Sequence, residues 1–155
     1  MWRFELLIPI LTSVILGVEV SNTPFRDCGS VNASVEHVHV NPCHTSPCSL
    51  YKGNNASIII EFRVHTPNIM PGNAIVMGVV SGMEIPFPLK EPNICKSIDQ
   101  GCPLNSTEKI YAFKFETNIS EDYPSLNFHV TWKLLNNLNA TFLCVQVPLA
   151  LTQKP

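Results

Sequence analysis

This sequence has little that could bind nucleic acid. Ten Lys and Arg residues are outnumbered by twelve Asp and Glu, the formal net charge is -2, and no basic cluster occurs. Nucleic acid and anionic membrane surfaces are both bound through concentrated positive charge. Neither is therefore expected as a partner of this chain.

Catalytic motifs are also missing. The chain has no Gly-x-Ser-x-Gly nucleophile elbow, no His-Glu-x-x-His zinc motif, no phosphate-binding glycine loop and no Cys-x-x-Cys pair. His37 and His39 lie two residues apart and could chelate a metal or sense an acidic pH, but a solvated pair is the simpler interpretation. The sequence thus predicts a protein that is not an enzyme and that uses no metal or cofactor.

Long apolar runs are confined to the N-terminus. Residues 6–17 form an apolar run that follows a single positive residue, Arg3. The run is too short and too interrupted by proline to span a bilayer, which is typical of a cleaved leader. We predict that residues 1–20 are a signal peptide and that residues 21–155 form one secreted domain.

The six cysteines of this short chain predict three disulfides, for which fifteen pairings are possible. Cys43, His44 and Cys48 look superficially like zinc ligands. Their spacing lacks the Cys-x-x-Cys form, however, and the cysteines of a secreted chain are normally oxidised to disulfides. A disulfide between Cys28 and Cys144 would close the longest loop and stabilise the fold by roughly 4 to 5 kcal/mol in the chain-entropy model. Spacing favours two small loops and one long closure: Cys43–Cys48, Cys95–Cys102 and Cys28–Cys144.

Five Asn-x-Ser/Thr sequons predict a glycosylated surface. Chance alone would supply only one or two, and a leader sequence places the chain in the compartment where glycosylation occurs. The expected glycosylation sites are Asn32, Asn55, Asn105, Asn118 and Asn139.

Short β-rich runs separated by Pro, Gly and Asn turns predict an all-β sandwich of six or seven strands. Alternation is clearest in residues 56–65, where Ile58, Ile60 and Phe62 share one face. A glycan on Asn55 must face water, so that apolar face is the inner one. Gly78 and Gly82 mark bulges or bends within residues 74–87, and residues 136–139 read as the last hairpin turn.

The segment Gly82 to Cys95, GMEIPFPLKEPNIC, combines the end of a buried strand with three prolines. Pro86 and Pro88 each fix φ and remove a backbone donor, so they should hold Phe87 in a defined orientation at a sheet edge. Phe87 is then either a core plug or the lip of an apolar opening.

Residues 25–149 carry many small motifs. Their order and spacing resemble those of the ML lipid-recognition domain family and, within it, those of the sterol carriers. The motifs are Asp27-Cys-Gly-Ser30, Val38-x-Val-x-Pro-Cys43, Pro47-Cys48, Leu50-x-Lys-Gly53, Pro86-Phe-Pro88, Glu91-Pro92, Cys95-Lys-Ser97, Cys102-Pro103 and Tyr123-Pro-Ser125.

The resemblance implies an immunoglobulin-like β-sandwich of about seven strands, with three disulfides in the pairing that spacing favours and with sheets splayed around one lipid. Phe87, Ile119 and Tyr123 are the positions that frame the opening in this family. The implied wall residues are Ile58, Ile60, Val76, Ile85, Val130 and Trp132.

A sterol or another apolar lipid is the ligand that the resemblance implies, and intracellular sterol transport is the implied role. The chain would then be a monomer in extracellular fluid or the lysosomal lumen that hands its ligand to membranes or to a membrane sterol transporter. Two positions depart from the vertebrate pattern: Val145 replaces a tryptophan, and Thr117 replaces an aliphatic residue near the opening.

Two other functions fit the same fold. The first is a lipid-recognition module of innate immunity or semiochemical binding, which would favour a cationic rim; only Lys90 and Lys96 lie near the expected opening. The second is an adhesion sandwich whose core is filled by its own side chains.

Overall fold

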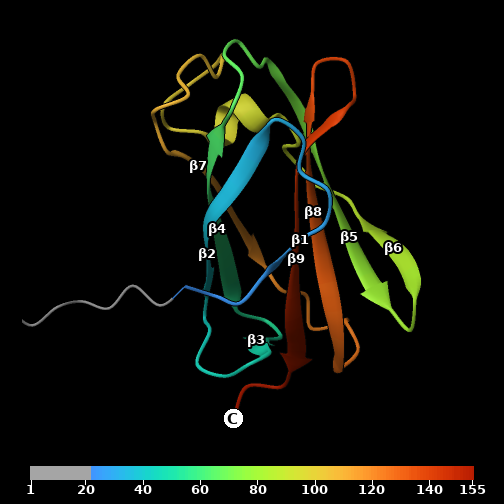
Figure 1. The fold of residues 1–155 in the computed structure, drawn as a ribbon. Helices are drawn as coiled ribbons and strands as arrows, with labels where there is room; N and C mark the ends of the chain where they lie inside the picture. The colour runs from blue at the N-terminus through green and yellow to red at the C-terminus, as the bar shows by residue number, and fades with distance from the viewer. Residues whose placement is uncertain (1–21) are drawn as a thin grey trace, which may run out of the picture.

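Two β-sheets face each other in the computed structural model, which describes residues 22–155 (Figure 1). The predicted signal peptide lies outside the described residues. No helix within residues 22–155 is long and apolar enough to cross a membrane. The strands are β1 Arg26–Asp27, β2 Ala33–Asn41, β3 Cys48–Tyr51, β4 Asn55–Val64, β5 Pro71–Val80, β6 Met83–Phe87, β7 Tyr111–Asn118, β8 Leu126–Asn136 and β9 Thr141–Thr152, with a 3-10 turn at Ile94–Ser97.

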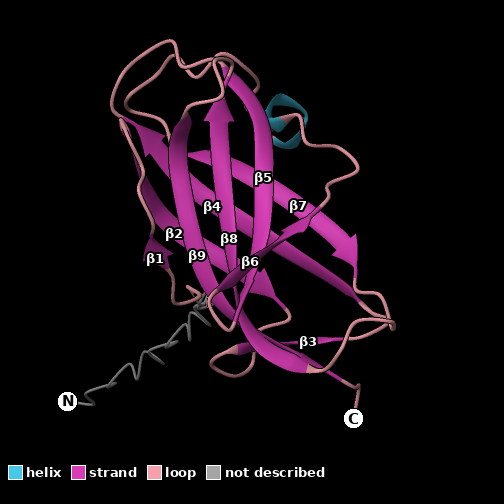
Figure 2. Ribbon diagram, turned by 90° about the vertical axis from the view of Figure 1, so that its right-hand side faces the viewer, coloured by secondary structure: helices cyan, strands magenta, loops and turns pink. Residues whose placement is uncertain are grey.

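The larger sheet has the order β1-β9-β8-β5-β6, with β3 added in parallel to β9; the smaller sheet has the order β2-β4-β7. In the view of Figure 2, β9, β8 and β5 run side by side, as their pairing requires. The expected all-β sandwich is confirmed. It has nine described strands rather than about seven, because β1 and β3 are short pieces that pair only with β9 and lack a long alternating pattern.

Tight turns with positive φ join the antiparallel neighbours. Ser81 and Gly82 have φ of 50° and 79° between the paired residues Val80 and Met83, as a two-residue hairpin of primed type requires. In the β8–β9 hairpin, the Asn136 side chain accepts hydrogen bonds from the backbone N–H groups of Leu138 and Ala140. The turn predicted at residues 136–139 is thereby confirmed.

Aromatic side chains fill one end of the space between the sheets. The ring centroid of Phe62 lies 5.9 Å from that of Tyr111 and 6.1 Å from that of Phe142, and all three residues are buried. Leu104 and Leu134 are fully buried in the same core. This end is closed by the protein's own side chains, so any ligand space must lie toward the other end.

Three disulfides pair Cys28 with Cys144, Cys43 with Cys48 and Cys95 with Cys102. The first ties the chain just after β1 to β9 near its start, whereas the other two close local loops. The five sequon asparagines are all exposed, as glycosylation would require. Asn55 and Asn118 are direct cross-strand neighbours, and the side-chain nitrogen of Asn118 donates to the Asn55 side-chain oxygen at 3.1 Å.

The loop that carries Cys28 is held by a carboxylate. An Asp27 oxygen accepts hydrogen bonds from the backbone N–H groups of Gly29 and Ser30, each at 2.9 Å. Partial burial raises the pKa of Asp27, but the hydrogen bonds from Ser30 and Gly29 more than offset this, and the pKa lies below its ordinary value.

Replacing Asp27 with alanine is expected to lower the free energy of unfolding by roughly 0.5 kcal/mol near neutral pH, since the site is exposed. A carboxyl group with a lowered folded pKa stabilises the fold above its unfolded pKa and loses this effect as the pH falls through the folded pKa. Urea unfolding of both proteins at about pH 6 and about pH 2.5 should show the difference only at the higher pH. An equal difference at both values would contradict this role.

Candidate binding cavity

A cavity of about 450 Å³ lies between the sheets at the end opposite the aromatic cluster. Residues at the ends of β2, β5, β7 and β9 and at the starts of β4 and β8 line it, and these strand ends meet at the lower end of the molecule in Figure 1. The volume falls within the range of about 300 to 1,000 Å³ that is usual for small-molecule sites.

The cavity wall is almost entirely apolar. Its lining residues include no His, Cys, Asp, Glu, Lys or Arg, and its only side-chain hydroxyls belong to Ser57, Thr117 and Tyr123. Such a wall can exclude water from a hydrocarbon but holds no acid–base pair and no metal-ligand set. Besides Tyr123 and the prolines, the aliphatic and aromatic lining residues are Val40, Leu50, Ala56, Ile58, Val76, Val80, Ile85, Phe87, Phe115, Ile119, Leu126, Phe128, Val130, Trp132, Leu149 and Leu151.

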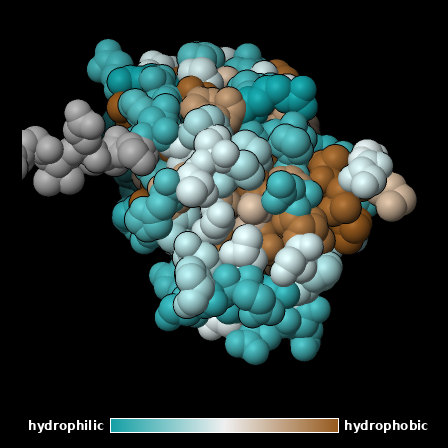
Figure 3. Space-filling model, turned by 90° about the horizontal axis from the view of Figure 1, so that it is seen from below, coloured by the Kyte–Doolittle hydropathy of each residue, from teal (hydrophilic) through white to brown (hydrophobic). Residues whose placement is uncertain are grey.

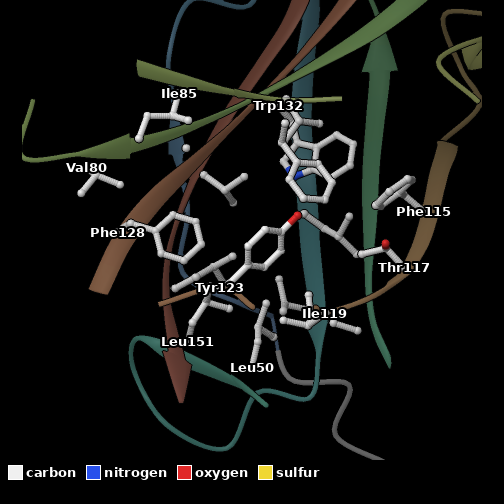
Figure 4. Close-up of a pocket in the computed structure, with 18 of the residues that line it drawn as sticks. Leu50, Val80, Ile85, Phe115, Thr117, Ile119, Tyr123, Phe128, Trp132 and Leu151 are labelled. Atoms are coloured by element: carbon white, nitrogen blue, oxygen red, sulfur yellow. The ribbon is translucent and has the colours of Figure 1, made fainter. Parts of the chain in front are cut away.

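Two aromatic rings meet at the mouth. Phe87 ends β6, and Tyr123 lies in the loop between β7 and β8; their ring centroids are 6.3 Å apart in an edge-to-face arrangement. Tyr123 is 38% exposed and points between the sheets, with its hydroxyl toward the interior (Figure 4). Phe87 pairs with Val76, and both residues line the cavity, so the Phe87 ring belongs to the inner face of the sheet edge.

Backbone hydrogen bonds fix the loop that presents Tyr123. The N–H of Gly53 donates to the Ile119 carbonyl at 2.6 Å, and the N–H of Ile119 donates to the Asn54 carbonyl at 2.8 Å. Gly53 has a φ of +80°, a conformation that strains any residue with a Cβ, and a Cβ here would also displace the flexible end of the Glu121 side chain. Glycine is therefore required where the β3–β4 turn supports the mouth.

Trp132 forms the floor of the cavity. Its indole packs edge to face against Phe115 and Phe113, with centroid distances of 5.0 and 5.7 Å. It is only 5% exposed and lies where the filled end of the core meets the open end.

The structure brings most of the predicted site residues together. Ile60 is fully buried but does not line the cavity, and Ile85 lines it while remaining 50% exposed at the edge strand. The predicted residues found in the lining are Ile58, Val76, Ile85, Phe87, Ile119, Tyr123, Val130 and Trp132.

Several lining residues were absent from the sequence prediction. Phe115 and Phe128 belong to the same inner faces as Thr117 and Val130, so alternation along β7 and β8 could have identified them. Leu50 gave no such signal, because β3 has four residues and reaches the cavity only through its parallel pairing with β9.

The two departures from the vertebrate pattern lie in different places. Thr117 lines the cavity, whereas Val145 is fully buried and does not. Neither Lys90 nor Lys96 belongs to the lining, and the Lys96 ammonium instead lies 2.8 Å from a Glu91 carboxylate oxygen. The cationic rim expected of an immune lipid-recognition module is therefore not found among the described lining residues.

His37 and His39 lie away from the cavity. The Nδ1 atom of His37 is 3.3 Å and the Nε2 atom of His39 is 3.6 Å from the same Glu61 carboxylate oxygen. These residues share the outer face of the β2–β4–β7 sheet with Arg63, so they make no contribution to the wall.

Apolar side chains continue outward from the mouth along the β5–β6 hairpin. Met83 is 64% exposed and follows the turn next to Val80, a lining residue. From below, the hydrophobic residues gather on the side of the molecule where this hairpin lies (Figure 3). The cavity therefore opens beside an apolar surface.

The fold described above agrees with that of known proteins. A family model described as the ML domain matches residues 22–151. The mouse protein named NPC intracellular cholesterol transporter 2 is 32% identical over 97% of this chain and 99% of its own length, and its bovine counterpart is 35% identical over 81% and 82%. The crystal structure of a Niemann-Pick type C2 protein from the Japanese carpenter ant superposes with a TM-score of 0.75 at 25% identity, over 83% of this chain and 99% of that one.

Proposed function

The chain belongs to the ML domain family, and from this premise we propose that it carries a sterol or a similarly apolar lipid between its two sheets. The observation that supports the proposal most directly is the apolar cavity of about 450 Å³ behind Phe87 and Tyr123. Relatives named as intracellular cholesterol transporters make a sterol the first candidate ligand.

Burial of hydrocarbon alone can account for useful affinity. Enclosing about 400 to 500 Å² of apolar ligand surface contributes about 10 to 12 kcal/mol before association costs. Association costs of about 4 kcal/mol leave about 6 to 8 kcal/mol, which corresponds to a dissociation constant of about 1 to 40 μM. Such a moderate affinity suits a carrier, because a ligand that is bound much more tightly would be released too slowly.

Carriage, rather than catalysis, is the activity that such a wall supports. A monomer that exchanges lipid through one mouth with a membrane or a membrane sterol transporter would meet its ligand source in extracellular fluid or the lysosomal lumen. The exposed apolar hairpin beside the mouth is the surface available for that exchange.

Identification of the co-purifying molecule tests the proposal. We expect native mass spectrometry of the secreted protein to show a one-to-one adduct with the mass of a sterol or another single apolar lipid. A multi-acyl glycolipid adduct would instead indicate the lipid-recognition module. A protein that is folded, carries no lipid after mild purification and takes up none from vesicles would contradict lipid carriage.

Replacing Phe87 with alanine is expected to weaken lipid binding about 20-fold. The ring would bury about 70 Å² of apolar ligand surface. At about 25 cal/mol per Å², this burial contributes close to 2 kcal/mol of binding free energy. Titration with a fluorescent sterol would measure the change, and Leu138→Ala in the exposed β8–β9 turn is the matched control. Equal affinity of the Phe87 and Leu138 variants would exclude Phe87 as part of the mouth.

A further inference from the structure

Trp132 has a hydrogen-bond donor that the protein itself does not use. Its side chain is 95% buried, and its indole N–H makes no hydrogen bond to any of residues 22–155. Every fully enclosed side-chain nitrogen or oxygen in that range of residues does have a partner. The indole nitrogen must therefore face accessible space, and the cavity is the space that Trp132 lines.

Figure 4 agrees with this placement, since the indole nitrogen of Trp132 lies on the cavity side of the ring. Phe113 and Phe115 pack edge to face against the indole and hold the ring in position. Val76 lies directly across the strand pairing, and none of the lining hydroxyls of Ser57, Thr117 and Tyr123 accepts a hydrogen bond from the indole. The donor is thus fixed at the floor of a site whose wall is almost entirely apolar.

An indole N–H can only donate, so its ligand partner must be an acceptor. Surrounding the N–H with a saturated hydrocarbon would leave it unpaired, which is costly in an apolar interior. A site with a buried donor therefore binds analogues that lack the matching oxygen much more weakly. A purely apolar pocket discriminates between ligands by size alone, and that discrimination is smaller.

We propose that the ligand carries an oxygen acceptor on the part that reaches the cavity floor and that this oxygen accepts a hydrogen bond from Trp132 Nε1–H. The chemical class is an oxygenated lipid with a buried carbonyl, ester, ether or hydroxyl oxygen. This inference rests on the proposed function, because it specifies the ligand of the same cavity. Trp132 is then a determinant of ligand specificity as well as the floor.

Matched ligand pairs test this specificity. Each pair has one carbon skeleton with and without a ketone: 5α-cholestane with 5α-cholestan-3-one, and nonadecane with nonadecan-2-one. Competition against a fluorescent lipid should show at least one ketone binding about tenfold more tightly than its hydrocarbon, as expected for a buried hydrogen bond. In Trp132→Phe, which keeps an aromatic floor without the N–H, the ratio of ketone affinity to hydrocarbon affinity should fall to about one, whatever the change in the two absolute affinities.

Trp132 also provides a direct spectroscopic readout in the unmodified protein. The sequence has two tryptophans, and the other, Trp2, lies in the predicted signal peptide, so the mature chain should give one indole N–H resonance. Binding of the preferred ketone should shift this proton downfield relative to the hydrocarbon complex. This measurement remains available if Trp132→Phe fails to fold.

Each outcome decides a different claim. An unchanged ketone preference in Trp132→Phe, or an indole resonance that is identical in both complexes, would overturn the role of Trp132 while leaving lipid carriage intact. Failure of the folded wild-type protein to bind any of the four probes, or any lipid from vesicles, would overturn lipid carriage itself and this inference with it.

Discussion

Replacing Gly78 with phenylalanine is expected to lower lipid affinity at least about 100-fold without unfolding the protein. Gly78 lines the cavity between Val76 and Val80 on β5, so a side chain here would project into the ligand space. A Cβ at this position meets only ordinary van der Waals contacts, with the Phe128 ring at 3.6 Å and the Ile85 carbonyl at 3.8 Å. The benzyl group would then occupy volume that the ligand needs.

Stability should be preserved, because aromatic residues favour strands more than glycine does, by up to about 1 kcal/mol. Gly78→Ala is the matched control, since one methyl group leaves most of the cavity open and should change affinity by less than about threefold. Fluorescent-sterol titration and thermal unfolding would be measured on both variants. Wild-type affinity in a folded Gly78→Phe variant would show that lipids bind elsewhere.

Removing the Cys28–Cys144 disulfide is expected to give the largest loss of stability of any single bridge. It joins residues 116 positions apart, and closing a loop of that size stabilises the fold by about 4 to 5 kcal/mol in the chain-entropy model. This is a large share of the roughly 5 to 15 kcal/mol by which native domains are stable. The variant Cys28→Ala/Cys144→Ala would be compared with wild type by urea unfolding.

The matched control is Cys43→Ala/Cys48→Ala, whose bridge spans five residues and should contribute only about 2 kcal/mol in the same model. Cys144 is buried, and the Cys28 N–H also donates to the Cys144 carbonyl at 3.1 Å, so the two chain segments should stay adjacent in any molecules that fold. Equal destabilisation of the two variants would mean that loop length does not set the contribution of these bridges.

Much of the sandwich follows from local patterns in the chain. Alternation from Ile58 to Phe62 defines the inner face of β4, and turn residues at 136–139 define the β8–β9 hairpin. Both signals are local, because side chains alternate along any strand and few residues tolerate a tight turn. Proline on both sides of Phe87 likewise identifies an edge position, although it leaves open whether the ring plugs a core or covers a mouth.

Gly78 shows where local reasoning stops. The sequence suggests a bulge or bend, yet β5 pairs regularly with β6 and β8 at this residue. Because Gly78 has no side chain, it leaves part of the cavity open. This role can be recognised only when the positions of the facing sheet and of the Phe128 ring are known. Ile60 gives the reverse case: its inward face is predicted correctly, but it lies deeper than the cavity.

By itself, the chain determined the long strands, the inner face of β4, the two small disulfide loops and the aromatic residue at the edge, since each depends on neighbours a few positions away. Tertiary structure decided that one end of the sandwich is filled by Phe62 and its partners, that the other end stays open, and that the Trp132 N–H faces the open space without a partner. The physical reason is that a cavity is set by the separation of two sheets and by long-range packing, which no periodicity along one strand encodes.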